Sequence, residues 1–226
     1  FVQPCANDSG SAIGTAADAQ FHLTGNAKIE WTVYTGENFV HDEADLSGFE
    51  ARPFSDTEIA DRLAAGAVLA WVEGRYEIGP RALGNRSLIA APFTAETHTR
   101  LNTIKKREGF RPIAPIVMEE EFGRLFENHG PSPHMLYFQR VLDAELKAVT
   151  HVDGSARAQT VSVTDNPRMH ALLSTFRDMT GFGVLCNTSL NFNGKGFINR
   201  LSDLARYARV TGLDGFVVGE TFYRKA

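Results

Sequence analysis

The clearest helical pattern of apolar positions along the chain lies between residues 167 and 180. Apolar side chains recur there at helical spacing and form one stripe, and Pro167 suits the first turn of a helix. A second helix is predicted over residues 57–65, because Ser55 can cap it and Glu58 completes a capping box. The stripe of the first helix consists of Met169, Leu172, Leu173, Phe176 and Met179.

Short apolar runs between the helical segments predict buried strands. The prolines of residues 111–118 keep that segment extended. Helices alternate with strands, but turn-rich extended pieces intervene, so the pattern predicts a mixed α/β (α+β) fold on a twisted sheet rather than a regular Rossmann array. The remaining predicted helices cover residues 96–108, 119–127 and 202–212, the last ending at Gly212, and the predicted strands cover 67–73, 87–92, 135–141, 157–163, 182–186 and 216–220.

The first part of the chain has a weaker pattern. Residues 1–20 are small and rich in Gly, Ala and Ser, and they predict a strand end, a turn at residues 7–10 and a helix through Ala17. Residues 21–55 are polar and mixed, with a plausible strand at 32–39. We therefore predict two regions, a first piece with a linker over 1–54 and a domain over 55–226.

Composition limits the kinds of partner. The chain has 226 residues, 43% of them hydrophobic, and a formal net charge of −4. No global basic field attracts nucleic acid or an acidic membrane, so nucleic acid is an unlikely partner and any anion site must be local. No apolar run approaches the length of a membrane span. Cys5 and Cys186 lie outside any CxxC motif, which suits two buried thiols in a reducing compartment, and we expect a cytoplasmic protein.

Four polar loops carry the candidate chemistry: residues 76–87, 105–112, 151–160 and 186–196. They supply glycines, short hydroxyls, amides and guanidinium groups, which together suit phosphates and a planar carbonyl group. We predict that Arg81 and Arg86 hold an anion; the alternative is that they pair with carboxylates such as those of Glu73 and Glu77. None of the loops pairs a Cys or Ser with an evident His base, and no P-loop motif is present.

The loop sequences "GRYEIGPRALGNRSLIAAP", "NTIKKREGFRPIAP", "HVDGSARAQTV" and "CNTSLNFNGKG", in this order, closely resemble the C-terminal half of the nodulation-protein and antibiotic O-carbamoyltransferases. The resemblance covers residues 55–226. It implies a YrdC-like α/β fold, a twisted sheet with flanking helices, that binds carbamoyl phosphate and ATP, with Mg²⁺, and makes carbamoyl adenylate. A preceding domain of the actin/hexokinase type would then move the carbamoyl group to a hydroxyl of a sugar or antibiotic.

The resemblance also implies roles for individual residues. Lys105, Lys106 and Arg107 with Arg111, and the Ser189-Leu190-Asn191 segment, would hold the adenylate, and Arg157 would meet the nucleotide phosphate. The amide and hydroxyl groups of the last loop can orient a carbamoyl group, since that group needs both donors and acceptors. The predicted catalytic residues are Lys106, Arg107 and Arg157; the predicted binding residues are Arg81, Arg86, Lys105, Arg111, His151, Asn187, Thr188, Ser189 and Asn191.

The segment "CANDSGSAIGTAA" resembles the end of the transferase domain. In that fold an aspartate ligates a metal, usually iron, together with two histidines on an earlier helix, and the matching residue here is Asp8. The paired histidines are absent from this sequence, so we expect an incomplete site, with Fe²⁺ bound only in the complete two-domain protein. The chain is expected to be a fragment that catalyses at most the adenylation half-reaction.

Three other readings stay open. A threonylcarbamoyl-adenylate synthase would have shorter loops and lack the "GPRALGNRS" form. A module that binds double-stranded RNA through a concave YrdC-like face would have to do so despite the net charge of −4. A fragment that folds but has lost activity with its partner domain has the same sequence features as an active one.

Overall fold

The predicted helix over residues 167–180 is α5 (Pro167–Thr180) in the computed structural model, which describes residues 3–127, 130–192 and 194–226. The Asn166 side chain caps its first turn by accepting a hydrogen bond from the Met169 N–H. Gly181 ends it in the left-handed conformation, with φ of 83°. The stripe is buried except at its end, where Met179 is 46% exposed.

The described strands form one mixed sheet of eight strands in the order β1-β10-β9-β2-β3-β8-β4-β7. The pairs β2–β9 and β4–β7 are parallel, and the other neighbours are antiparallel. A small separate ribbon pairs β5 (Gln139–Arg140) with β6 (Ser155–Ala156). The main strands are β1 (Phe49–Pro53), β2 (Val68–Val72), β3 (Arg86–Ala90), β4 (Ala114–Met118), β7 (Gln159–Val161), β8 (Val184–Ser189), β9 (Gly215–Val218) and β10 (Thr221–Lys225).

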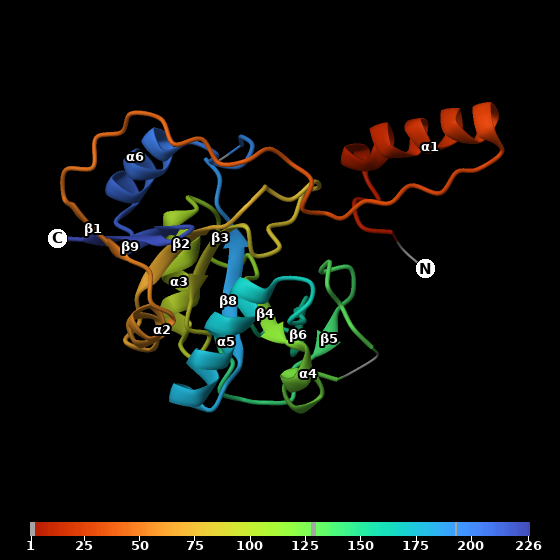
Figure 1. Ribbon diagram of the computed structural model, residues 1–226. Helices are drawn as coiled ribbons and strands as arrows, with labels where there is room; N and C mark the ends of the chain where they lie inside the picture. Colours follow the sequence, from red (N-terminus) through yellow and green to blue (C-terminus); the bar gives the residue numbers. More distant parts are fainter. Residues whose placement is uncertain (1–2, 128–129, 193) are drawn as a thin grey trace.

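Helices cover both faces of this sheet (Figure 1). Leu69 and Trp71 of β2 pack with α2 (Asp56–Ala64) and α5, whereas Val68 and Ala70 pack on the opposite side with α3 (Ala95–Ile104) and α6 (Leu201–Thr211). The alternation follows from the pleat, which points successive side chains to opposite faces. Helix α4 (Glu119–Leu125) joins the second of these cores. The predicted mixed α/β fold with flanking helices is confirmed.

Several predicted elements have different limits. The helix predicted over 96–108 ends at Ile104, because the chain turns at Lys106, whose φ is 49°. The strand predicted over 135–141 is reduced to β5, since Met135 adopts a φ of 54° that no strand accommodates. Strand β8 continues beyond Cys186 to Ser189. The edge strand β1 and its neighbour β10 were not predicted.

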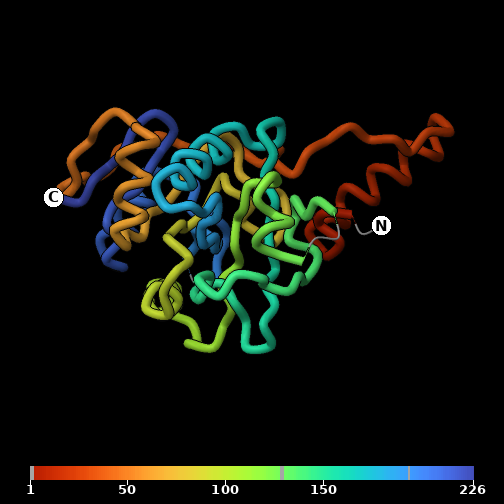
Figure 2. The backbone as a smooth tube through the Cα atoms, turned by 90° about the horizontal axis from the view of Figure 1, so that it is seen from below, coloured from red at the N-terminus to blue at the C-terminus, as the bar shows by residue number. Residues whose placement is uncertain are grey.

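The N-terminal segment forms an arm on the sheet domain. After a short helix at Asp8–Gly10, helix α1 (Ser11–Thr24) continues well past Ala17, and none of its residues is buried. Figures 1 and 2 both show α1 standing out from the rest of the molecule. The foot of the arm is fixed by the Cys5 thiol, which donates to the Ile78 carbonyl at 2.8 Å. Residues 1 and 2 of the predicted strand end lie outside the described residues.

The strand predicted over residues 32–39 is wrong. This segment is a loop with an isolated bridge from Asn38 to Arg75, and Val40 just beyond it bridges to Arg200. Its polar residues leave no continuous apolar face to bury against a sheet. Both predicted buried thiols are confirmed, because Cys5 is 9% exposed and Cys186 is fully buried.

Phe176→Ala should lower the free energy of unfolding by about 3–5 kcal/mol, because it opens a cavity in the core between α2, α5 and the sheet. Met179→Ala on the same helix should change it by less than ~1 kcal/mol, since that side chain is half exposed. Urea unfolding of both variants measures the difference. Equal losses would contradict the packing described.

Candidate functional site

The four polar loops meet at one edge of the sheet. Strand β2 ends beside the start of β3, and Ser87 of β3 lies opposite Ser189 at the end of β8. Ala114 at the start of β4 lies opposite Asn187, and β7 begins beside β4 at Gln159. The loops that follow β2 and β8 and those that precede β4 and β7 therefore share this edge, as binding loops commonly do on a rigid sheet.

The ammonium group of Lys105 is at the centre of one cluster. Its Nζ donates to the carbonyl and, at 3.2 Å, to the hydroxyl of Ser189, and to Oδ1 of Asn191. The side chain is 8% exposed. Burial, with the nearby charge of Arg107, lowers the pKa of Lys105 to about 7. The structure thus brings together three residues that the sequence resemblance grouped.

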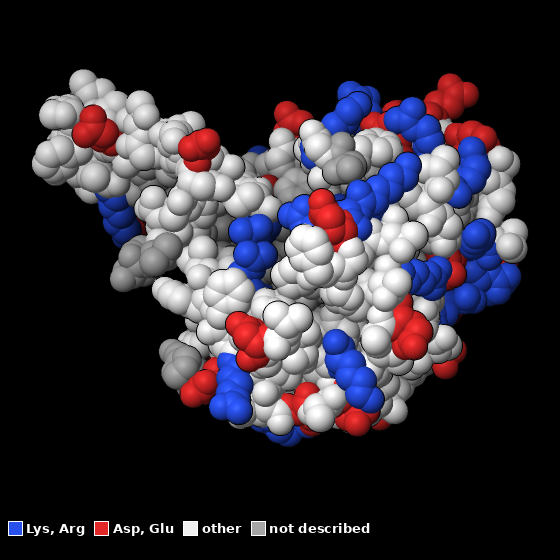
Figure 3. Space-filling model, turned by 180° about the vertical axis from the view of Figure 1, so that it is seen from behind, with Lys and Arg blue, Asp and Glu red and all other residues white. Residues whose placement is uncertain are grey.

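Further cations lie beside Lys105. Arg107 donates through Nε to Asn102 Oδ1 at 2.6 Å, and burial and the charge of Arg111 lower its pKa. Lys106 and Arg111 are exposed. Figure 3 shows Lys and Arg side chains gathered over part of one face of the molecule, with acidic side chains among them. Such a concentration of positive charge favours an anion over a neutral ligand.

A second cluster surrounds a cavity of about 220 Å³ lined by Arg81 and Arg157. The Nε of Arg157 is buried and has no hydrogen-bond partner among the described residues. Burial and the charge of Arg81 lower the pKa of Arg157. His151 lies nearby, its ring against Phe138, and burial lowers its pKa. Two arginines that line the same cavity suit an anion.

Arg86, predicted to hold an anion, bonds within the protein in this structure. It is fully buried, and all five of its guanidinium N–H groups are used within the protein. They reach the carbonyls of Glu73, Gly74 and Asn85 and Oδ1 of Asn199. The side chain therefore has no donor left for an anion in this structure, and it holds the loop that carries Arg81. It bonds to carbonyls rather than to the side-chain carboxylates named as its alternative partners.

Glu77 holds the backbone of the same loop through hydrogen bonds. One oxygen of its buried carboxylate accepts from the N–H groups of Leu83 at 2.6 Å, Asn85 at 2.8 Å and Arg86 at 3.2 Å. Burial raises its pKa, and the three backbone donors oppose that shift. Sequence reasoning treated Glu77 only as a possible salt-bridge partner. Only its place just before a glycine- and proline-rich loop pointed to this role.

The last loop divides between two environments. Ser189 and Asn191 face Lys105, whereas buried Asn187 donates to the Ala82 carbonyl at 3.1 Å and to Gln159 Oε1 at 3.0 Å. The Oδ1 of Asn187 is buried and has no partner among the described residues. Thr188, on the opposite side of the strand, is 9% exposed. Binding by these four residues stays a prediction, and Asn193 of this motif lies outside the described residues.

The predicted metal ligand Asp8 is exposed at the start of the short helix before α1. Within residues 3–127, 130–192 and 194–226, no group of three or more His, Cys, Asp or Glu side chains could hold a metal ion. The residues present therefore do not form an iron site, and the role of Asp8 in a larger site stays a prediction.

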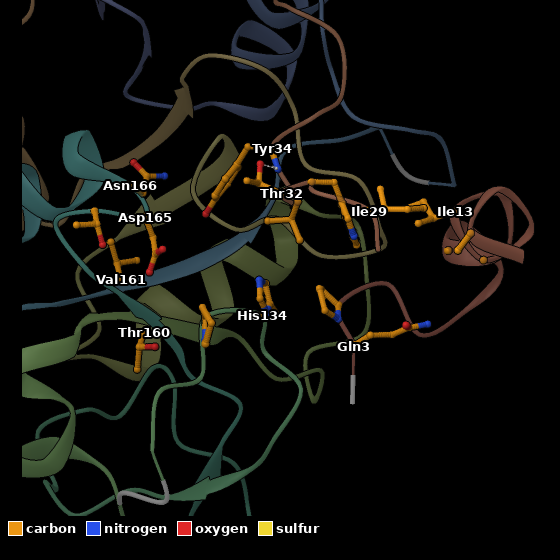
Figure 4. Close-up of a pocket in the computed structure, with 18 of the residues that line it drawn as sticks. Gln3, Ile13, Ile29, Thr32, Tyr34, His134, Thr160, Val161, Asp165 and Asn166 are labelled. Atoms are coloured by element: carbon orange, nitrogen blue, oxygen red, sulfur yellow. Dashed lines mark hydrogen bonds between the residues drawn. The ribbon is translucent and has the colours of Figure 1, made fainter. Parts of the chain in front are cut away.

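A larger cavity of about 560 Å³ separates α1 from the sheet domain. Figure 4 shows Ile13 of α1 on one side and Asp165 and Asn166 on the other, with Thr32 and Tyr34 between them. No predicted site residue lines this cavity.

Among the described residues, no helix is long and apolar enough to cross a membrane.

Arg86→Ala should lower the free energy of unfolding by about 3–5 kcal/mol. The substitution leaves buried carbonyl oxygens without their donors and the Glu77 carboxylate without a nearby cation. Arg81→Ala, an exposed position on the same loop, should change it by less than ~0.5 kcal/mol. Urea unfolding measures both. A small effect at Arg86 would contradict its structural role.

Sulfate binding should weaken above pH 7. The pKa of Lys105 is about 7 in the free protein, and a bound anion raises it. Below pH 7 the amine is already charged when the anion binds. Above pH 7 the amine must take up a proton for the anion to bind. The association constant should then fall by up to about tenfold per pH unit above pH 7. Calorimetry at about pH 6, 7, 8 and 9 measures the association constant. Sulfate is used because its own charge does not change over this range. Lys105→Met should flatten the profile, and an unchanged slope in that variant would exclude Lys105 as the cause.

Comparison with known proteins places this chain among relatives. The model of the carbamoyltransferase C-terminus family matches residues 60–225. The 3'-hydroxymethylcephem-O-carbamoyltransferase of Streptomyces clavuligerus is 56% identical over 227 residues, covering 100% of this chain and 44% of that protein. Nodulation protein U of Rhizobium fredii is 38% identical over 213 residues, covering 93% of this chain and 36% of that protein. The chain spans less than half the length of these curated relatives.

Solved structures support the fold. Full-length HypF in its phosphate- and nucleotide-bound form has a TM-score of 0.53 at 14% identity, covering 74% of this chain and 25% of that chain. HypF of T. kodakarensis has a TM-score of 0.51 at 12% identity, covering 81% and 24% respectively. At these identities the likeness concerns the fold alone. The family model, by contrast, spans most of the sheet domain and its polar loops, and on that match the chain belongs to the carbamoyltransferase C-terminus family.

Proposed function

We propose that this chain binds ATP and carbamoyl phosphate and forms carbamoyl adenylate. The observation that supports this best is the contact of the Lys105 amine with Ser189 and Asn191, beside Arg107. These groups come from two loops far apart in sequence, and the resemblance assigns both to the adenylate. Membership of the carbamoyltransferase family favours this reading over a threonylcarbamoyl-adenylate synthase or an RNA-binding module.

The proposed reaction needs no covalent intermediate on the protein. Water hydrolyses carbamoyl phosphate to carbamate and phosphate. A carbamate oxygen then attacks the α-phosphorus of ATP, the bond from that phosphorus to the bridging oxygen breaks, and pyrophosphate leaves. Negative charge develops on the phosphoryl oxygens and on the leaving group, so fixed cations and positioning supply the catalysis.

The residues take separate parts in this proposal. Lys105 and Arg107 stabilise charge at the phosphoryl group being transferred, and Ser189 and Asn191 orient the carbamoyl amide. Arg81 and Arg157 bind a phosphate group in their own cavity, and the resemblance assigns the nucleotide phosphate to Arg157. The described residues hold no cluster of three carboxylates or other metal ligands. Mg²⁺ would therefore be held mainly by the substrate phosphates and water, as is common for this ion.

In this proposal, the transfer of the carbamoyl group to a hydroxyl needs a longer protein that includes the preceding domain. The relatives are more than twice as long as the matched region, and their names describe a cephem carbamoyltransferase and a nodulation protein. We propose an acceptor hydroxyl on an antibiotic or a sugar, with the contacts to that acceptor in the part that precedes this domain.

Calorimetry with ATP and Mg²⁺, with and without carbamoyl phosphate, and an assay for pyrophosphate release test the proposal. The wild-type chain should bind ATP and release pyrophosphate only when carbamoyl phosphate is present. Ser189→Ala should reduce turnover by about 10²-fold or more, because it removes a positioned hydroxyl next to Lys105.

Thr175→Ala is the matched control, because this hydroxyl on α5 bonds only to its own helix, at the Ala171 carbonyl. It should leave turnover unchanged. ATP binding without turnover would mean that the preceding domain completes the site. Affinity for double-stranded RNA without any ATP binding would contradict the proposal and support the RNA-binding alternative.

A further inference from the structure

The backbone carbonyl of Leu83 is where three segments of the chain meet. Its oxygen accepts one hydrogen bond from the hydroxyl of Tyr34 at 2.9 Å and another from Nε2 of Gln159 at 2.8 Å. A carbonyl oxygen has two lone pairs, and both are used here. The N–H of Leu83 donates to the buried carboxylate of Glu77 at 2.6 Å. Side chains therefore hold both polar groups of the backbone at this position.

Gln159 joins the two segments that carry the arginines of the cavity of about 220 Å³. It lies two residues after Arg157, and the carbonyl that it contacts lies two residues after Arg81. The side chain of Gln159 is 1% exposed, and its Oε1 accepts from Nδ2 of Asn187 at 3.0 Å. Both ends of its amide group are thus bonded, so the side chain holds one orientation. The bond to Leu83 therefore sets the separation of the two segments that carry the arginines.

Tyr34 brings a third segment, the one between α1 and β1, to the same carbonyl. The backbone of this segment is fixed next to the loop, because the N–H of Ile78 donates to the carbonyl of Val33 at 2.7 Å. Figure 4 shows Tyr34 among the residues that line the larger cavity beside α1. Burial raises the pKa of Tyr34, and the charge of Glu77 raises it further, so the hydroxyl keeps its proton and stays a donor. The part of the chain that follows the arm therefore helps to hold the loop that carries Arg81.

The two arginines need such a tie because their positive charges repel each other. Burial lowers the pKa of Arg157, and the nearby charge of Arg81 lowers it further. Without an anion between them, this repulsion drives the two segments apart. The loop that carries Arg81 also contains Gly79 and Gly84, and glycine has the widest range of backbone conformations. The two hydrogen bonds to the Leu83 carbonyl oppose both effects.

We propose that Tyr34 and Gln159 are positioning residues for the cavity that Arg81 and Arg157 line. Through the carbonyl of Leu83 they hold the two arginines at the separation at which both guanidinium groups contact one anion. Neither positioning residue is among the described residues that line the cavity, whereas Leu83 is, so both act through its backbone. The inference rests on the proposed function only in its assignment of a phosphate group to the two arginines.

Calorimetry with sulfate tests the inference on the wild-type chain, Tyr34→Phe, Arg81→Ala and the double variant. At about pH 9 the Lys105 amine, whose pKa is about 7, is mostly uncharged, so the cluster around it binds less sulfate. Tyr34→Phe should weaken sulfate binding about threefold or more, because one hydrogen bond that holds the Arg81 loop is lost. In the Arg81→Ala chain the same substitution should have no effect, since the guanidinium that it positions is absent.

Gln159→Met should show the same dependence on Arg81, because methionine is an unbranched, flexible side chain that cannot donate to the Leu83 carbonyl. Tyr223→Phe is the matched control and should alter no affinity, since two strands separate β10 from β3 in the sheet. Thermal unfolding of each variant gives the temperature range in which the chain is folded, and the affinities are compared within that range.

Equal sulfate affinities of the wild-type chain and Tyr34→Phe, together with weaker binding by Arg81→Ala, would overturn the inference. An equal loss with and without Arg81 would also overturn it, because the hydroxyl would then act on the fold as a whole. Sulfate binding that does not depend on Arg81 would do the same. If the dependence on Arg81 is found but the chain neither binds ATP nor releases pyrophosphate, the proposed function fails and the positioning role stands.

Discussion

The buried guanidinium of Arg86 is the interaction on which the rest of the site depends. It fastens the end of β2 to the start of β3 through the carbonyls of Glu73, Gly74 and Asn85, and it reaches across to Asn199. Without that fastening the intervening loop would have many conformations, and Arg81 would have no fixed direction. Glu77 completes the arrangement, since it gathers three backbone N–H groups of the same loop on one oxygen.

In the ligand-free protein, the candidate site holds buried positive charges that repel one another. Burial lowers the pKa of both Lys105 and Arg157, and the nearby charges of Arg107 and Arg81, respectively, lower them further. A buried cation without a counter-charge destabilises the folded state, and an anion that enters relieves the repulsion. The three N–H groups of Lys105 already donate to Ser189 and Asn191, so these contacts would have to be shared or exchanged when an anion binds in the proposed function.

The sequence allowed the general fold to be predicted, and also the grouping of Lys105 with Ser189 and Asn191, because both depend on local patterns. The stripe on α5 and the run in β2 bury apolar groups at fixed periods, and Lys105, Ser189 and Asn191 belong to recognisable loops. The role of Arg86 was not predictable, since its partners are three backbone carbonyls, which any sequence could supply, and the side chain of Asn199, which is distant in sequence. The edge strand β1 was missed for a related reason: its sequence, "FEARP", has little apolar pattern, and the strand exists because β10 offers it hydrogen bonds.

The place of β10 in the sheet has a consequence for the order in which the sheet forms. Among the described strands, β1 joins the sheet only through β10, and the pair brings Phe49 beside Lys225, from distant parts of the sequence. Contacts between segments so far apart form slowly relative to local contacts. Until β1 pairs, the free side of β10 stays open to other chains. The pairing of β1 therefore both closes this side of β10 and attaches the segment leading from the arm to the sheet.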